Sequence, residues 1–335
     1  MKPSSKETLT RFQSLFALVA MVIVLSLMSG SWSGFTGFWR DFLTAENGLN
    51  VLRQISINLC LSIGMTLVIL SGGIDLSVGS VLAISGAVAA GLLKNGLALA
   101  WFDMQLQFTP FGAIIAGIAV GLALGWVNGM TITRLRLPPF IATLGMLSIA
   151  RGLSMLWTHG HPITDLGRTF EIIGSGMWLK LPVIVWICVA LIALFYVVSV
   201  HTTLGRYIHA VGGSERAAMF AGLRVEGVKV WVYVLAGGLA GVSGVLLTAR
   251  LNSATPNAGI GYELDSIAAV VIGGTSLSGG RGSVFGTVMG CLIIGVLNSG
   301  LVKLGVSPEW QMVMKGAVIL FAAAIDKVGT RNERA

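Results

Sequence analysis

Long apolar runs separated by short polar intervals dominate the chain. Most of these runs approach the ~20 residues that a membrane-crossing helix needs. The pattern predicts an all-α, polytopic membrane protein of about ten transmembrane helices. The predicted spans cover residues 15–28, 51–70, 76–93, 111–133, 140–157, 181–200, 230–249, 264–275, 284–302 and 310–326.

Two stretches of the pattern leave alternatives open. The polar tail 1–14 and the apolar run 15–28 fit either a signal peptide or a first span, and the absence of a convincing cleavage site after Met28 favours an uncleaved span. The run 264–275 is short, so we expect a broken or partial helix there. Before it, the polar segment 251–265 is expected either to rest against an external partner or to form a solvated loop.

Composition agrees with a membrane protein. Hydrophobic residues make up 55% of the chain and charged residues 11%, with a mean hydropathy of +0.86, whereas soluble domains carry roughly 25% charged residues. The net charge of +8 is scattered over short loops, so it indicates membrane topology and lipid contact rather than nucleic-acid binding. The three cysteines each lie in an apolar run, which favours small core residues over disulfides or a metal site.

The distribution of basic residues predicts the orientation, because cytoplasmic loops are enriched in Lys and Arg. With ten spans and the N-terminus inside, thirteen of the 22 basic residues fall on the cytoplasmic side and seven outside, while Arg151 and Lys315 fall within spans. We therefore expect one transmembrane domain over residues 1–335 in a bacterial inner membrane. Its cytoplasmic segments would be the tails 1–14 and 327–335 and the loop 201–229.

The loop 201–229 is the longest polar interval in the second half of the chain. Gly212 and Gly213 suggest a hinge that opens a short helix, with Ser214 as its N-cap and Glu215 favourable in its first turn. A membrane protein has little reason to build such an element unless something outside the bilayer docks on it.

Several polar side chains lie within the predicted spans. Asp75 is expected to cap a helix that begins at Leu76, or else to contact a transport path or gate, because carboxylates in membranes are costly. Uncharged amides inside apolar runs suit hydrogen bonds to another helix or to a hydroxyl-rich solute. Arg151 either pairs near a helix end or binds the solute. The candidate path or gate residues are Asn58, Asp75, Asn128 and Asn298.

Motifs for catalysis are missing from the sequence. No Gly-Lys dipeptide occurs, so the chain has no Walker A loop for hydrolysing ATP itself. The four histidines lie in or beside loops without metal-ligand spacing. We expect no enzymatic activity, no catalytic residue, no bound metal and no cofactor of its own.

Glycine is abundant inside the apolar runs, with 45 residues in the chain. Small residues three or four positions apart let helix backbones approach closely in lipid. Residues 72–80 and 273–280 also resemble each other, which indicates either an internal repeat of the kind found in transporters or simply the glycine-rich composition.

Four stretches resemble a known family over residues 45–326. They are SGGIDLSVGSVLAISGAVAA at 71–90, LPPFIATLGMLSIARGLSMLWTHGHPI at 137–163, TTLGRYIHAVGGSERAAMFAGLRV at 202–225 and GYELDSIAAVVIGGTSLSGGRGSVFGTVMG at 261–290. Together they are similar to the permease subunits of bacterial monosaccharide ABC importers, the ribose, xylose and galactose class.

The resemblance implies a type II ABC importer permease fold and import of a monosaccharide such as ribose into the cytoplasm. It implies a second permease subunit, either identical or related, a periplasmic sugar-binding protein, and a cytoplasmic ATPase that binds ATP and Mg. It also implies a coupling helix that enters a groove of the ATPase. Ser214 stands where the family often has Asn; both residues cap helices, so the change affects partner preference rather than coupling. The implied coupling residues are Gly213, Ser214, Glu215, Arg216, Ala217, Ala218 and Gly222.

Two other functions compete with this interpretation. A secondary transporter or channel working without an ATPase would be expected to carry conspicuous intramembrane carboxylates, and only Asp75 is a candidate. A membrane scaffold would carry no solute. Neighbouring genes for a P-loop ATPase and a secreted binding protein would separate the three.

Overall fold

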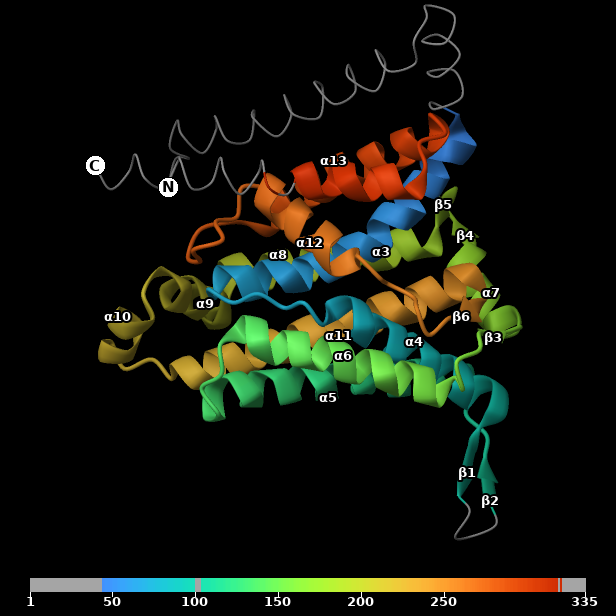
Figure 1. The fold of residues 1–335 in the computed structure, drawn as a ribbon, viewed down its shortest axis with the longest axis horizontal. Coiled ribbons are helices and arrows are strands. Elements are labelled where there is room, and N and C mark those ends of the chain that lie inside the picture. The colour runs from blue at the N-terminus through green and yellow to red at the C-terminus, as the bar shows by residue number, and fades with distance from the viewer. Residues whose placement is uncertain (1–43, 100–103, 319, 321–335) are drawn as a thin grey trace, which may run out of the picture.

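The computed structural model describes residues 44–99, 104–318 and 320 (Figure 1). The predicted span 15–28 and the two predicted tails, 1–14 and 327–335, lie outside the described residues. The predicted span 310–326 is described only in part, within a helix that begins at residue 308.

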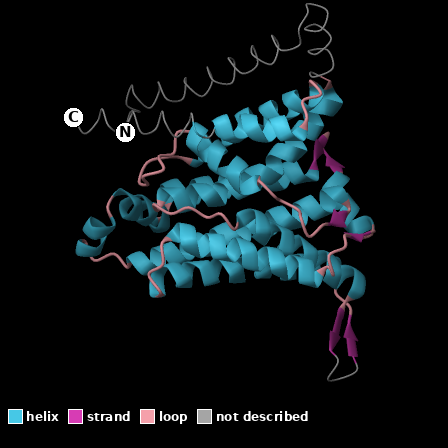
Figure 2. Ribbon diagram, viewed as in Figure 1, coloured by secondary structure: helices cyan, strands magenta, loops and turns pink. Residues whose placement is uncertain are grey.

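Seven helices in the described part of the chain are long and apolar enough to cross a membrane. They run roughly side by side as one bundle (Figures 1 and 2), which agrees with a polytopic membrane protein. The count of ten is not confirmed, because the predicted span 264–275 is only the 11-residue helix α12 (Tyr262–Ile272), about 16 Å long. The seven are α3 (Ala45–Leu70), α4 (Val78–Asn95), α5 (Pro110–Arg134), α6 (Pro139–Trp157), α8 (Val183–His201), α11 (Val225–Leu251) and α13 (Val284–Lys303).

Short elements mark the two ends of the bundle. Helices α9 (Thr203–Gly213) and α10 (Glu215–Phe220) lie at one end, which we call the α10 end. The opposite end carries α7 (Arg168–Ser175) and short antiparallel strands, and we call it the hairpin end (Figure 2). An all-α prediction missed these strands. They pair as β1 (Leu97–Leu99) with β2 (Met104–Leu106), β3 (Ile163–Thr164) with β6 (Ser253–Ala254), and β4 (Met177–Trp178) with β5 (Leu181–Pro182).

Two helices extend beyond their apolar runs. Helix α3 begins at Ala45 rather than near residue 51, because Thr44 caps it by accepting a hydrogen bond from the Asn47 N–H at 3.3 Å. Helix α11 begins at Val225 rather than near residue 230, and Glu226 lies in its first turn, where a negative charge is favourable.

Glycines bring α5 and α11 into backbone contact. A Cβ on Gly125 would collide with the Tyr233 carbonyl oxygen and lie 3.1 Å from the Gly237 Cα. Gly121, one turn earlier on α5, faces Gly237 and Gly241 in the same way. The expectation that these glycines serve close helix packing is confirmed.

Helices α4 and α12 begin inside the bundle rather than at its ends (Figure 1). Residues 71–77 lead inward from the α10 end to α4, and residues 252–261 lead inward from the hairpin end to α12. The two helix starts meet, since a Cβ on Gly79 would lie 2.5 Å from Glu263 Oε2. The segment 251–265 therefore runs into the bundle rather than forming a solvated loop, and its contact with an external partner stays a prediction. Arg151 holds it by donating to the carbonyl oxygens of Pro256 and Ala258, both at 2.8 Å.

The two similar glycine-rich stretches lie side by side at the α10 end. The Gly280 N–H donates to the Leu70 carbonyl oxygen at 2.9 Å. They hold different places in the fold, however, since one follows the 26-residue α3 and the other follows the 11-residue α12. These two stretches therefore do not occupy equivalent places in the fold, and the internal repeat stays a prediction.

Candidate functional site

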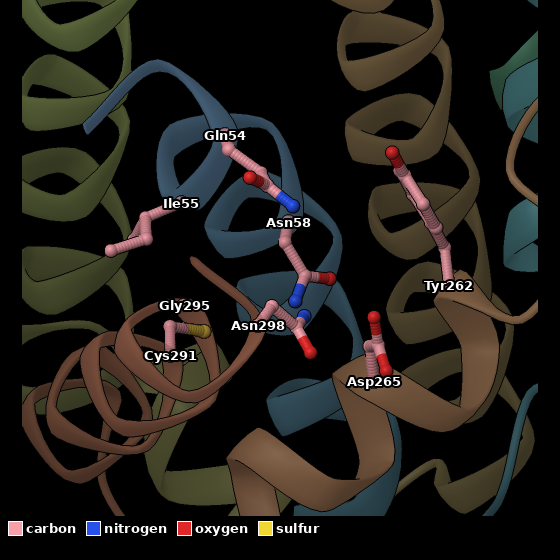
Figure 3. A pocket seen from close by; sticks show the side chains of 8 residues that line it. All are labelled: Gln54, Ile55, Asn58, Tyr262, Asp265, Cys291, Gly295 and Asn298. Carbon is pink, nitrogen blue, oxygen red and sulfur yellow. The ribbon is translucent and has the colours of Figure 1, made fainter. Parts of the chain in front are cut away.

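A polar pocket lies where α3, α12 and α13 meet (Figure 3). Each helix presents one face to it, because side chains three, four or seven positions apart share a helix face. The lining residues are Gln54, Ile55 and Asn58 from α3, Tyr262 and Asp265 from α12, and Cys291, Gly295 and Asn298 from α13.

The pocket carries both satisfied and unsatisfied polar groups. Asn58 Oδ1 accepts a hydrogen bond from Ser266 Oγ at 3.2 Å, and Asp265 Oδ2 accepts one from Lys315 Nζ at 2.9 Å. Asn298 is 7% exposed, and its Oδ1 has no hydrogen-bond partner among the described residues. A buried oxygen left unpaired costs about 1–3 kcal/mol, so this amide is suited to accept a hydrogen bond from a water or a hydroxyl group.

The pocket is narrow in this conformation. Its volume is about 310 Å³ including the open mouth, of which about 20 Å³ can take the centre of a water molecule. That is enough for one ordered water and too little for a sugar ring. A sugar could use these polar groups only if the helices around the pocket moved apart.

Asp75 and Asn128 lie in a separate buried cluster around the start of α4. Asp75 Oδ1 accepts hydrogen bonds from the Ser77 N–H at 2.8 Å and from Ser77 Oγ at 2.6 Å. Asn128 Nδ2 donates to Ser77 Oγ at 2.9 Å. The expected helix start at Leu76 is wrong, because residues 74–76 still run inward and the N-cap is Ser77. Asp75 fixes that cap residue instead of capping the helix itself.

The structure therefore divides the four candidate path residues into two pairs. Asn58 and Asn298 share the pocket, whereas Asp75 and Asn128 share the cluster that fixes the segment 71–77. A role of either pair in transport stays a prediction.

The loop 201–229 contains more helix than expected. The prediction that Ser214 caps a short helix is confirmed, since its side chain accepts a hydrogen bond from the Ala217 N–H at 3.3 Å. Gly212 and Gly213, however, end helix α9 rather than form a free hinge. Helix α9 was missed because its apolar residues, such as Ile208 and Val211, are interrupted by polar ones and form no continuous run.

Helix α10 projects from the bundle (Figure 1). Ala218 is buried against the rest of the chain, whereas Met219 is 53% exposed and Phe220 is 92% exposed. Lys229 Nζ contacts Glu215 Oε2 at 2.7 Å and fastens α10 to the first turns of α11. Glu215 thus has a basic partner within the chain itself.

Metal-ligating clusters are not found in the described part of the chain: no group of three or more His, Cys, Asp or Glu is placed to hold an ion. Cys60, Cys188 and Cys291 are free and buried, as expected for core residues.

Six of the eight lining residues were not predicted from the sequence, and three of these six carry polar side chains that matter here. Gln54 lies one turn before Asn58, and that spacing is the one signal that could have found it. Tyr262 and Asp265 fell within a segment interpreted as an external loop, so only the inward course of residues 252–261 shows that they line the pocket.

Comparison with known proteins identifies the family. A protein-family model described as branched-chain amino acid transport system / permease component matches residues 47–323. The chain belongs to this permease family. The permease is 46% identical over 312 residues to the ribose import permease protein RbsC of Bacillus subtilis (strain 168), covering 92% of this chain and 90% of that protein.

Two further relatives have sugar transport in their names. The permease is 43% identical over 327 residues to the ribose import permease protein RbsC of Escherichia coli (strain K12), covering 96% of this chain and 95% of that protein. It is 36% identical over 323 residues to the D-allose transport system permease protein AlsC of the same strain, with coverages of 95% and 92%. The resemblance inferred from the sequence is confirmed, and the permease is a multi-pass transport component rather than an enzyme.

Proposed function

We propose that the chain is the permease subunit of an ATP-driven ABC importer that moves ribose or a similar monosaccharide from periplasm to cytoplasm. The observation that carries the proposal is α10, a capped six-residue helix with exposed apolar side chains, in a chain that lacks a Walker A loop of its own. The relatives named as ribose import permeases support the sugar class.

In this proposal the α10 end faces the cytoplasm and the hairpin end faces the periplasm, as the excess of basic residues in the loop 201–229 favours. Both termini are then cytoplasmic. A cytoplasmic ATPase docks on α10 and supplies the site for ATP and Mg, so the permease needs no cofactor. A periplasmic binding protein delivers the sugar, and a second permease subunit, identical or related, completes the path through the lipid bilayer.

The coupling residues Gly213, Ser214, Glu215, Arg216, Ala217, Ala218 and Gly222 surround the exposed side chains of Met219 and Phe220. Burying a fully exposed Phe side chain in a groove contributes about 1.5–3 kcal/mol. Phe220 is therefore the anchor we expect to enter the ATPase, while the Glu215–Lys229 ion pair keeps α10 in position.

The pocket forms one wall of the solute path in this proposal. Asn58 and Asn298 offer amide groups to sugar hydroxyls, while Asp75 and Asn128 act indirectly by fixing the segment 71–77. The present width admits a water molecule but no sugar, so passage requires that α3 and α13 separate.

Substitution of Phe220 by Ala tests the docking site. We expect Phe220→Ala to weaken association of the purified permease with its ATPase by about tenfold or more, because the buried anchor is lost. Binding is measured by titrating labelled ATPase against permease in nanodiscs. The matched control is Phe111→Ala, since Phe111 is 72% exposed at the start of α5, at the other end of the bundle. Equal affinity for wild type and Phe220→Ala would refute docking through α10.

Two substitutions test coupling rather than affinity alone. Glu215→Arg replaces the ion pair with Lys229 by a repulsion, and Gly213→Pro removes a helix-forming N–H at the end of α9. We expect both to abolish sugar-stimulated ATP hydrolysis by the reconstituted complex. Unchanged stimulation of ATP hydrolysis would show that the loop 201–229 has no role in coupling.

A separate experiment would identify the sugar: a thermal-shift screen of sugars on the partner binding protein.

A further inference from the structure

Three chain segments that are distant in sequence meet at the α10 end. They are the C-terminus of α3, the last turn of α9, and the glycine-rich turn between α12 and α13. Their contacts are made mostly by backbone atoms. We call this contact the glycine joint, and it consists of Leu70, Gly72, His209, Gly212, Gly279 and Gly280.

Hydrogen bonds link the three segments. The Gly280 N–H donates to the Leu70 carbonyl oxygen at 2.9 Å, so one of the carbonyl groups left free at the end of α3 is satisfied from another segment. The Gly280 carbonyl oxygen lies 3.2 Å from His209 Nδ1, which donates to it. Gly280 thus joins α3 to α9, and its φ of +75° favours glycine at this position.

Gly212 has no room for a side chain. A Cβ there would collide with the Leu70 carbonyl oxygen and lie 2.6 Å from the Gly280 N–H nitrogen. Gly279 is similarly enclosed, since its Cβ would lie 2.9 Å from the Gly212 oxygen and 3.1 Å from the Gly72 Cα. Backbone atoms in direct contact cannot yield by changing rotamer, so a displacement of α9 must displace its neighbours.

Two of these three segments, the end of α3 and the turn between α12 and α13, belong to the helices that line the pocket. Helix α3 contributes Gln54 and Asn58, and the turn at residues 273–283 connects α12 and α13, which contribute Asp265 and Asn298. The joint is also directly connected to α10 along the chain, because Ser214 is both the C-cap of α9 and the N-cap of α10. The joint therefore links α10 to the helices of all three walls through backbone contacts.

We propose that the glycine joint transmits movement of α10 to α3, α12 and α13, and that Gly212 and His209 are the positioning residues that make the transmission rigid. The proposal rests on the proposed function, since it assigns a route to the coupling between ATPase and solute path. It assigns the coupling to a contact with named members rather than to a general pathway.

The test uses the full complex of permease, ATPase and binding protein in liposomes. Gly212→Ala is compared with Gly227→Ala, because Gly227 lies near the same end, in the first turn of α11, and a Cβ there would meet only the Arg224 Cβ, at an ordinary contact distance of 4.0 Å. We expect Gly212→Ala to retain the ATPase in co-purification while sugar-stimulated hydrolysis and sugar uptake fall by about tenfold. Gly227→Ala should match wild type in all three measurements.

His209 provides a second, milder test that does not depend on how well Gly212→Ala folds. His209→Leu removes the donor to Gly280, whereas His209→Asn keeps a donor of similar reach. We expect loss of stimulation in the first and its rescue in the second, with the ATPase bound in both. If Gly212→Ala or His209→Leu kept wild-type stimulation of ATP hydrolysis and wild-type sugar uptake, the proposed role of the glycine joint would be wrong. Failure of the wild-type permease to bind any ATPase would instead overturn the proposed function.

Discussion

At the scale of single residues, the Asp265–Lys315 ion pair is the most consequential contact in the pocket. The Asp265 side chain is 8% exposed, whereas that of Lys315 is 27% exposed. The long Lys315 side chain can extend toward the membrane surface when it loses its partner, whereas the short, buried Asp265 side chain cannot. The pair ties the short helix α12 to the helix that begins at residue 308.

This asymmetry predicts unequal effects of removing either partner. Lys315→Met leaves a buried carboxylate without a cation and should lower the unfolding free energy by about 1–3 kcal/mol. Asp265→Asn leaves a lysine whose long side chain can extend toward the membrane surface, so its cost should be smaller. Thermal melting of the purified variants in one detergent measures the difference, and a larger loss for Asp265→Asn would contradict it.

Residue-scale features were predictable only where they depend on local sequence. The Ser214 cap follows from neighbouring residues and could be read directly. The partners of Asp75, namely Ser77 and through it Asn128, depend on how α4 and α5 pack, which no local pattern contains. The unpaired Asn298 oxygen is likewise a product of three helices meeting.

At the scale of elements, glycine contacts decide how closely α5 and α11 approach. Gly125 faces the α11 backbone directly, whereas a Cβ added to Gly48, in the first turns of α3, would meet nothing within 4 Å. Alanine is favoured over glycine inside a helix by roughly 0.5–1 kcal/mol. The same substitution should therefore act in opposite directions at the two sites.

We expect Gly125→Ala to destabilise the permease by about 1–3 kcal/mol, because the added methyl group forces the two backbones apart. Gly48→Ala should leave stability unchanged or raise it slightly. Fluorescence-monitored melting in detergent provides the comparison. Equal melting temperatures for Gly125→Ala and wild type would show that the helices separate without cost.

Long apolar helices could be predicted from the sequence because the lack of water in lipid forces a continuous hydrophobic run. Helix α9 could not, since it lies across the end of the bundle and needs only one apolar side. The strands at the hairpin end are two or three residues long, too short for alternation to be visible. The 11-residue α12 was correctly expected to be partial, although its course from inside the bundle was not.

At the scale of the whole molecule, orientation in the membrane is the main prediction to test. His161 lies in an exposed turn at the hairpin end, and Glu226 is exposed at the α10 end. The three native cysteines are buried, so the parent protein should give little background with thiol reagents.

We expect His161→Cys to react with a membrane-impermeant maleimide in intact cells, because the hairpin end faces the periplasm. Glu226→Cys should react only after the membrane is dissolved in detergent. Gel-shift of the labelled permease reports both reactions. The reverse pattern would invert the proposed orientation and place α10 out of reach of any cytoplasmic ATPase.

The meeting of α4 and α12 inside the bundle also has an electrical consequence. The N-terminus of a helix carries about half a positive elementary charge, so two helix starts that face each other would create a positive field deep in the protein. Asp75 lies beside one start, and Glu263 lies in the first turn of the other. Each carboxylate offsets the charge of its own helix end. Each carboxyl group accepts a hydrogen bond from the backbone N–H of its own N-cap residue, Ser77 or Gly261, so neither buried helix start is left without an acceptor beside it.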